Sequence, residues 1–495
     1  MTSSAAKQLR TQSALDVSND ELRQIADLST QLVLNYFNQV NERDVVTRNY
    51  QAKKGRLPKP DLAWDPVPLD QLIDECETIF DLSRHNGHPR FFGYVASPST
   101  AIGAYADLVA SALNANVTCW RSAPAGTEVE KLVVRWLGEL IGYSKTAHGL
   151  LTSGGSMANL TALLIASRRK LGREASKTGL LNCGPPITIY TSDEVHMSIP
   201  KAADILGFGR DYVQTVACDD RARMNVQALR ERIQADLRNG LRPFCVVASA
   251  GTVNTGAVDP LTEIAAVARE FDLWFHVDGA YGAPAALDSG KKYLFTGLEL
   301  ADSVSLDPHK WLYVPVDAGC LLFRDEATAK AAFSTDEADY IKVHGLSGDE
   351  TFAFWDFGIE LSRRFRALKV GLTLRYYGVR RIAEAISGDI ALAEYMAQRF
   401  EEADDFELLA PVELSICCFR YRPPGVEETE LDRLNETILT IVQKGGQAYV
   451  SNAVVNGHFA LRACITNFRT TRADIERTVE VIREAARQAV STTSR

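Results

Sequence analysis

The residues best placed for chemistry are an aspartate and a lysine that each follow an apolar segment. Asp278 ends the segment FHVD, and Lys310 lies 32 residues further along, in SLDPHKWLYVP. Taken alone, the lysine would be a surface residue and the aspartate a helix cap or salt-bridge partner. Lys310 lies between two apolar segments, however, where partial burial is expected to lower its pKa and leave its amine able to form a Schiff base. We therefore interpret Lys310 as a nucleophilic amine, with Asp278 as a candidate partner.

A short turn, SGGS at 153–156, lies directly before a predicted helix. Backbone N–H groups at the start of a helix, together with the helix dipole, favour an anion such as phosphate. An isolated SGGS is more often a glycine turn followed by a serine N-cap. The turn matches neither G-x-G-x-x-G nor a Walker sequence with G-K-[ST], which disfavours a dinucleotide or nucleoside triphosphate site. It is a candidate phosphate site.

The elements that must position these residues alternate along the middle of the chain. From about residue 100 to 325, helices alternate with short apolar strands such as CVVASAG and LWFHVDGA. This alternation indicates an α/β domain with a largely parallel sheet, whose functional groups gather beyond the strand ends. Strands such as LSICCFRYR and FALRACITN, later in the chain, indicate a smaller α+β domain.

The N-terminal segment has a different pattern. Apolar residues recur at helical spacing from Leu22 to Val40, which predicts an amphipathic helix. Residues 51–68 contain four prolines and are interpreted as an extended connector. We predict three parts: an N-terminal helical arm over residues 1–100, a large domain over 101–370 and a small C-terminal domain over 371–495.

The composition favours a multi-domain globular protein that acts on small molecules. The chain has 495 residues, 46% of them hydrophobic and 24% charged, and a formal net charge of -9. A negative charge disfavours general affinity for nucleic acid or anionic membranes. No segment has the apolar run of a signal peptide or membrane span, so we expect a soluble protein. The nine cysteines include no C-x-x-C pair, which suggests neither a metal site nor a disulfide framework and favours the cytoplasm.

Several of these segments together resemble the group II decarboxylases that depend on pyridoxal 5′-phosphate (PLP), a family that includes aromatic L-amino acid, histidine and glutamate decarboxylases. DPHKW at 307–311 resembles the Schiff-base motif of the family, and its distance from Asp278 suits the same pattern. The likeness extends from HPRFFGY, through SGGSMANLTALL and SDEVHMSIPKAADILG, to SRRFRALK. It is closest in pattern to the aromatic L-amino acid decarboxylases.

The resemblance implies four catalytic residues. Lys310 would form the Schiff base with PLP, and Asp278 would pair with the protonated pyridine nitrogen, which keeps the ring an electron sink. His196 would stack on the cofactor ring. Tyr340 would return a proton to the substrate carbon after carbon dioxide leaves, whereas relatives with phenylalanine there tend toward aldehyde formation.

The resemblance also implies binding residues. Those expected at the cofactor are Gly154, Gly155, Ser156, His196, Thr252, Asp278, Ala280, His309 and Lys310. Those expected at the substrate are Tyr94, Val95, Ser362 and Arg363. Ser362 is the residue type that plant relatives tend to carry for phenolic substrates, whereas Val95 departs from the pocket wall of the animal aromatic enzymes. Arg363 is open to two interpretations, a substrate carboxylate anchor or a structural ion pair.

The fold that the resemblance implies is that of aspartate aminotransferase, or fold type I. Its large α/β domain has a mostly parallel seven-stranded sheet and is followed by the small domain, and members form homodimers with active sites at the interface. The expected reaction is decarboxylation of an aromatic L-amino acid, with a phenolic side chain slightly favoured. The alternatives are an acidic or other non-aromatic amino acid, such as glutamate or 2,4-diaminobutyrate, and a decarboxylation-dependent aldehyde synthase.

Overall fold

The computed structural model describes residues 15–58, 62–172, 174–333 and 348–493. The chain divides after His85 into two compact units, Met1–His85 and Asn86–Arg495. The three-part division expected from the sequence remains a prediction. A membrane-spanning helix is not found in the described part of the chain, because no helix there is both long and apolar enough.

The first unit is built around two helices, α1 (Asn19–Gln39) and α3 (Leu69–Leu82), which pack against each other. Ser18 begins α1 with a reciprocal capping box to Glu21, which satisfies backbone donors at the helix start. The predicted N-terminal helix is therefore confirmed. The prediction of an extended connector is wrong at its start, where α2 (Tyr50–Lys53) and a 3-10 turn (Lys54–Arg56) precede the first proline.

The second unit contains a seven-stranded sheet. Its strands are β2 (His148–Thr152), β3 (Ile187–Ser192), β4 (Val213–Val216), β5 (Arg242–Ser249), β6 (Trp274–Asp278), β7 (Ser303–Leu306) and β8 (Gly319–Phe323). Their spatial order is β2-β8-β7-β6-β5-β3-β4. Only β8 runs against the others, pairing antiparallel with both β2 and β7. The predicted mostly parallel sheet of an α/β fold is thus confirmed.

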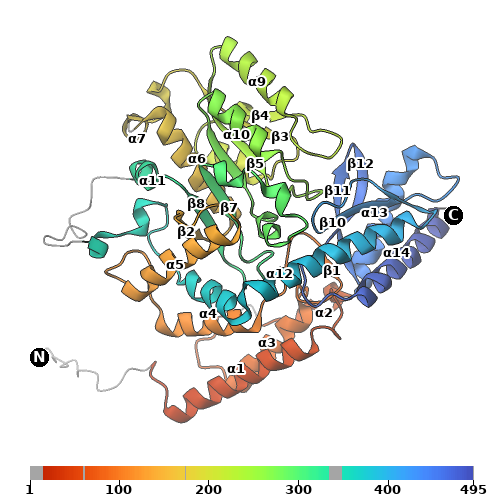
Figure 1. The fold of residues 1–495 in the computed structure, drawn as a ribbon. Coiled ribbons are helices and arrows are strands. Elements are labelled where there is room, and N and C mark those ends of the chain that lie inside the picture. The colour runs from red at the N-terminus through yellow and green to blue at the C-terminus, as the bar shows by residue number, and fades with distance from the viewer. Residues whose placement is uncertain (1–14, 59–61, 173, 334–347, 494–495) are drawn as a thin grey trace, which may run out of the picture. The chain divides into compact units, whose positions relative to one another are not determined.

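Helices accompany this sheet in the alternation expected from the sequence (Figure 1). They are α4 (Ala101–Leu113), α5 (Pro124–Leu140), α6 (Gly155–Leu171), α7 (Glu174–Thr178), α8 (Ser198–Ile205), α9 (Val226–Arg238), α10 (Leu261–Glu270) and α11 (Glu326–Phe333). Helix α6 packs across β5, β6, β7 and β8. The central strands are buried along their length, because both faces of a parallel sheet are covered.

A second, smaller sheet has five strands in the spatial order β1-β11-β12-β10-β9. Its strands are β1 (Phe91–Phe92), β9 (Phe406–Leu408), β10 (Ile416–Tyr421), β11 (Tyr449–Val455) and β12 (His458–Cys464). Helices α13 (Glu428–Gly445) and α14 (Arg472–Thr493) pack beside it. The long helix α12 (Arg366–Glu401), interrupted at Gly378 with φ 72°, contacts α4 and α5 as well as β9 and β10.

Candidate active site

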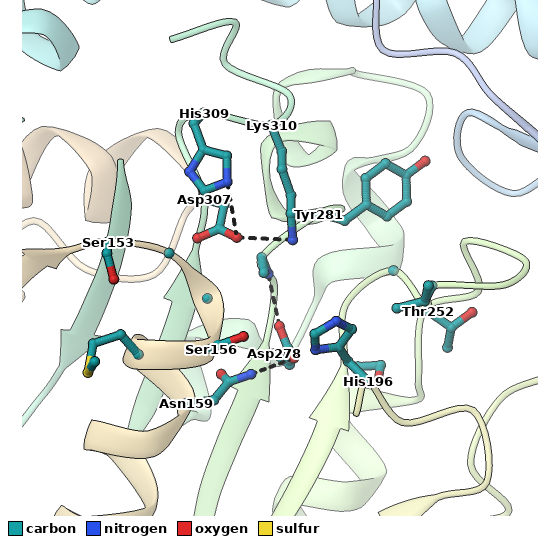
Figure 2. Close-up of a pocket in the computed structure, with 17 residues that line it drawn as sticks. Ser153, Ser156, Asn159, His196, Thr252, Asp278, Tyr281, Asp307, His309 and Lys310 are labelled. Carbon is teal, nitrogen blue, oxygen red and sulfur yellow. Dashed lines mark hydrogen bonds and ion pairs between the residues drawn. The ribbon is translucent and has the colours of Figure 1, made fainter. Parts of the chain in front are cut away.

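The candidate site is a cavity of about 330 Å³ at the carboxyl ends of the strands of the large sheet. Asp278 ends β6, Lys310 follows β7, and Thr252 follows β5. His196 lies beyond β3, and the turn at 153–156 leads from β2 into α6. These segments are far apart in the sequence, yet they meet because parallel strands end at the same edge. Figure 2 shows their side chains around one space.

All nine residues predicted to contact the cofactor line this cavity. They are Gly154, Gly155, Ser156, His196, Thr252, Asp278, Ala280, His309 and Lys310. The sequence did not single out Asn159, Tyr281 or Ser249, which also line it. Asn159 lies four residues after Gly155 on α6, so helical spacing from the SGGS turn was the available signal.

Lys310 is held by an ion pair. Its Nζ lies 3.0 Å from Asp307 Oδ2, and His309 Nε2 lies 3.9 Å from the same oxygen (Figure 2). Burial by itself lowers the pKa of Lys310, but the Asp307 and Asp278 carboxylates outweigh it and raise the pKa above its usual value. The expectation of a lowered pKa is therefore wrong. Its apolar neighbours in the sequence did not reveal that two carboxylates converge on the amine.

Asp278 is buried and accepts three hydrogen bonds. Asn159 Nδ2 donates to Oδ2 at 2.8 Å, while the Ser305 hydroxyl and the Ala280 backbone N–H donate to Oδ1 at 3.0 and 3.1 Å. Burial raises the pKa of Asp278, but the positive charge of Lys310, the nearby His196 and His276 and the Ala280 N–H bring it below its usual value. The carboxylate is thus held in its ionised form.

His196 lies beside this carboxylate and is held from one side of its ring. Its Nδ1 lies 2.7 Å from Ser198 Oγ and accepts the Ser198 backbone N–H at 3.2 Å. Burial lowers its pKa, and Lys310 lowers it further against the opposing effect of Asp278. The ring is therefore uncharged at neutral pH, as suits a residue that packs flat against another ring.

The turn at the start of α6 has no room for larger side chains. A Cβ on Gly155 would lie 3.0 Å from both Ala280 Cβ and Asp307 Oδ2. A Cβ on Gly319, at the start of β8, would lie 2.4 Å from Gly154 Cα. These glycines keep the backbone N–H groups at the α6 N-terminus within reach of the cavity, where they suit a phosphate.

The donor set of the cavity fits PLP. A helix N-terminus suits its phosphate, a buried carboxylate suits its ring nitrogen, and a lysine amine suits its aldehyde. The uncharged His196 imidazole provides a flat surface for the ring. Among the described residues no cluster of three or more His, Cys, Asp or Glu side chains could hold a metal ion.

The residues predicted to bind substrate do not line the cavity. The Tyr94 hydroxyl lies 3.2 Å from that of Tyr449, Val95 is partly buried, and Ser362 is exposed. The Arg363 guanidinium is buried, pairs with Glu130 and donates to the Val117 carbonyl.

Of the two interpretations of Arg363, the structure therefore favours the structural ion pair over the substrate anchor, since the carboxylate of Glu130 already neutralises its charge. Tyr340, the predicted proton donor, lies outside the described residues.

Comparisons with known proteins agree with this geometry. The model of the pyridoxal-dependent decarboxylase conserved domain matches residues 53–422. The aromatic-L-amino-acid decarboxylase of Bacillus atrophaeus is 34% identical over 465 residues, covering 93% of this chain and 94% of that protein. The phenylacetaldehyde synthase of Arabidopsis thaliana is 29% identical over 481 residues, covering 95% and 96%.

Among solved structures, that of Oryza sativa TDC with PLP and tryptamine is similar over almost the whole chain. It has a TM-score of 0.87 and 27% identity, and the match covers 97% of this chain and 99% of that one. A likeness of this extent includes both sheets, so the fold of the two proteins is the same.

Proposed function

The chain belongs to the pyridoxal-dependent decarboxylase family, and we propose that it converts an aromatic L-amino acid into the corresponding amine and carbon dioxide. Its cofactor is PLP. The observation that carries the proposal is the meeting of Lys310, Asp278 and His196 in one cavity beside the N-terminus of α6. Together they offer an amine, a carboxylate and a flat ring next to a phosphate cradle.

In this proposal Lys310 would hold PLP covalently, while Gly154, Gly155, Ser156 and His309 would hold its phosphate. Asp278 would pair with the ring nitrogen, and His196, Thr252 and Ala280 would contact the ring. When bound, PLP supplies an electron sink for the pair of electrons left when the bond between Cα and the carboxylate breaks.

Side chains of the protein supply the charges and proton transfers that accompany cleavage of this bond. The Lys310 amine must lose a proton before it can act as a nucleophile. Asp307 Oδ2, 3.0 Å from Nζ, is placed to accept that proton. Asp278 stays ionised because the positive charge of Lys310 and the Ala280 N–H lower its pKa, so its negative charge is in place before the reaction begins. We assign the return of the proton to Cα to the Tyr340 hydroxyl, on the resemblance of its segment to the catalytic loop of the family.

An aromatic substrate is supported by the relatives. The Bacillus atrophaeus protein is named for aromatic L-amino acids, and two Oryza sativa relatives are named for tryptophan. A Petroselinum crispum relative, 29% identical, is named for tyrosine. We propose Tyr94, Val95 and Ser362 as substrate-pocket residues, with Ser362 favouring a phenolic ring.

A second candidate function is aldehyde formation. It is favoured by the phenylacetaldehyde synthase of Arabidopsis thaliana and by a 4-hydroxyphenylacetaldehyde synthase of Rhodiola rosea, which is 33% identical over 436 residues. That reaction would consume oxygen and water and release ammonia and hydrogen peroxide besides carbon dioxide. The presence of tyrosine at position 340 supports the amine-forming reaction instead.

We further propose that the protein works as a homodimer. Exposed apolar side chains gather on α4 at Leu108, Val109 and Leu113, and further along the chain at Val316 and Leu361. The segments that carry them are tied together, since Lys369 Nζ lies 2.9 Å from Asp107 and 4.0 Å from Asp317.

Exposed apolar side chains of this kind suit contact with a second copy of the chain, as the family resemblance implies. A cytoplasmic location is supported by the nine cysteines, none of which is in a disulfide.

The test is a spectrum followed by a substrate panel. Purified protein with PLP should absorb near ~420 nm, and Lys310→Ala should lack this band. Release of carbon dioxide, ammonia and hydrogen peroxide is then measured with aromatic, acidic and basic amino acids. Carbon dioxide without ammonia, for aromatic substrates, supports the proposal, and equal amounts of all three products support the aldehyde reaction. A protein with no band after addition of PLP would contradict both.

A further inference from the structure

His276 is a fully buried histidine next to the cavity that the proposed chemistry does not use. It lies in the middle of β6, two residues before Asp278, so the alternation of a strand directs both side chains to the same face of the sheet. In the neighbouring strand, Ser303 is opposite His276 and Ser305 is opposite Asp278. Burial lowers the pKa of His276 to about 4, so its ring is neutral and carries one N–H.

The position of that proton follows from the partners of the ring. Trp274 Nε1, which is only a donor, donates to Ser303 Oγ at 2.8 Å. The Ser303 hydroxyl can donate its own hydrogen to His276 Nδ1, also at 2.8 Å. Asn159 Oδ1, which is only an acceptor, lies 3.0 Å from the remaining nitrogen, Nε2, so Nε2 carries the hydrogen and donates it.

This donation and the Asp278 carboxylate together fix the orientation of the Asn159 side-chain amide. With Oδ1 facing His276, the two hydrogens of Nδ2 are directed to Asp278 Oδ2 at 2.8 Å and to Ser198 Oγ at 2.9 Å. The flipped amide would place its oxygen against the Asp278 carboxylate and its N–H groups against the N–H of His276. The hydrogen bonds of Oδ1 and of Nδ2 thus favour the same orientation of the amide. Figure 2 shows the Asn159 side chain in this orientation, with its nitrogen toward Asp278.

We propose that His276 is a positioning residue that fixes the Asn159 amide so that it donates to Asp278 and keeps this carboxylate ready to receive the ring nitrogen of PLP. The inference rests on the proposed role of Asp278. Without the His276 N–H, the Asn159 oxygen loses its donor, the amide is free to turn over, and Asp278 loses one of its three hydrogen bonds. The ring nitrogen would then face an Asp278 carboxylate whose pKa is higher and whose orientation is less fixed.

The test compares two ligands that cannot bond covalently to Lys310. Pyridoxine 5′-phosphate keeps the ring nitrogen but has no aldehyde, and its deaza analogue has C–H in place of that nitrogen. Dissociation constants are measured by calorimetry for the native protein and for His276→Leu and Asn159→Ala. The native protein is expected to prefer pyridoxine 5′-phosphate, and both variants should lose about tenfold of that preference because a hydrogen bond to a charged group is lost. Binding of the deaza analogue should stay within about twofold.

Two further variants separate positioning from folding. His276→Gln keeps an amide N–H that can donate to Asn159 and should retain most of the preference. Tyr190→Phe removes a buried hydroxyl on β3 that bonds Asp236 outside the cavity, and should leave the preference intact. If His276→Leu does not fold, Ser303→Ala takes its place, since it removes the hydroxyl that bonds Nδ1.

The outcomes are distinct. A preference that is unchanged in folded variants, or an equal loss for both ligands, would overturn the role of His276 while leaving Asp278 in place. A native protein that binds both ligands equally would instead contradict the proposed role of Asp278.

Discussion

The Trp311 indole N–H donates to the buried carboxylate of Asp389 at 2.9 Å, which ties the residue next to Lys310 to helix α12. The Tyr313 hydroxyl donates to the same oxygen at 2.7 Å. Trp311 also stacks on Tyr281, a residue of the cavity wall, with ring centroids 5.2 Å apart. The side chain of Asp389 thus fixes the segment that carries Lys310 to helix α12.

This arrangement makes the stability of the protein depend on pH. Burial raises the pKa of Asp389 to about 7, so the folded state binds its proton more tightly than the unfolded state. The protonated Asp389 side chain stabilises the folded state fully below the usual pKa of an aspartate, and this stabilisation is lost as pH rises toward 7. Asp389→Asn, which cannot ionise, should therefore gain stability relative to the native protein between pH 5 and pH 8, by up to a few kcal/mol. Urea unfolding at each pH measures the difference, and a constant difference would contradict the prediction.

The charge of Asp278 should matter more than its shape. Asp278→Asn keeps the size of the side chain but removes the negative charge, and its kcat is expected to fall by about 10²- to 10³-fold. Asp236→Asn is the matched control, because Asp236 is also buried but lies outside the cavity and accepts from Tyr190. Steady-state release of carbon dioxide measures both, and a similar loss in the two variants would show a general effect of buried aspartates.

Gly155 should be required for binding of PLP. Gly155→Ala would place a Cβ 3.0 Å from Ala280 Cβ and Asp307 Oδ2, so the turn or these neighbours must shift and disturb the phosphate site. We expect the dissociation constant of PLP to rise about tenfold. Gly388→Ala, also in a helix but with nothing within 4 Å of the new Cβ, should leave it unchanged and stabilise α12 slightly. Equilibrium dialysis measures both variants. An equal affinity of Gly155→Ala and the native protein for PLP would show that the turn does not bind the phosphate.

Tyr340 should decide between amine and aldehyde. Tyr340→Phe removes the hydroxyl that we propose as the donor to Cα, so the product should shift toward aldehyde, with ammonia and hydrogen peroxide in amounts equal to the carbon dioxide. Tyr376→Phe is the control, because Tyr376 is an exposed tyrosine on α12. Mass spectrometry of the products, with an oxygen electrode, gives the ratio. A variant that forms only amine would assign the proton to another group.

The exposed apolar side chains of α4 are expected to hold the proposed homodimer together. Leu108→Glu places a charge among the exposed apolar side chains of α4 and should shift the sedimentation coefficient from dimer to monomer. Leu181→Glu changes an even more exposed leucine elsewhere, 98% against 62%, and should leave the dimer intact. A native protein that sediments as a monomer would contradict the homodimer itself.

Local patterns in the sequence predicted much of this protein. Helical spacing from Leu22 to Val40 predicted α1, and the apolar runs before Asp278 and near Lys310 predicted buried strands that end at the cavity. Such patterns succeed because secondary structure and burial depend mainly on near neighbours. The resemblance then identified nine of the residues that line the cavity, whereas the four residues that it implied for the substrate do not line it.

Only the tertiary structure decided how these groups affect one another. The pKa of Lys310 rises because Asp307, three residues before it, and Asp278, at the end of β6, both reach its amine, which no pattern of apolar neighbours reveals. Asn159 contacts His276 across 117 positions of the chain, from α6 to β6. Electrostatic and hydrogen-bond energies depend on distance in space, so they are set when distant segments pack together. The sequence by itself determined which groups this protein has for its chemistry, and the fold determined their charges and orientations.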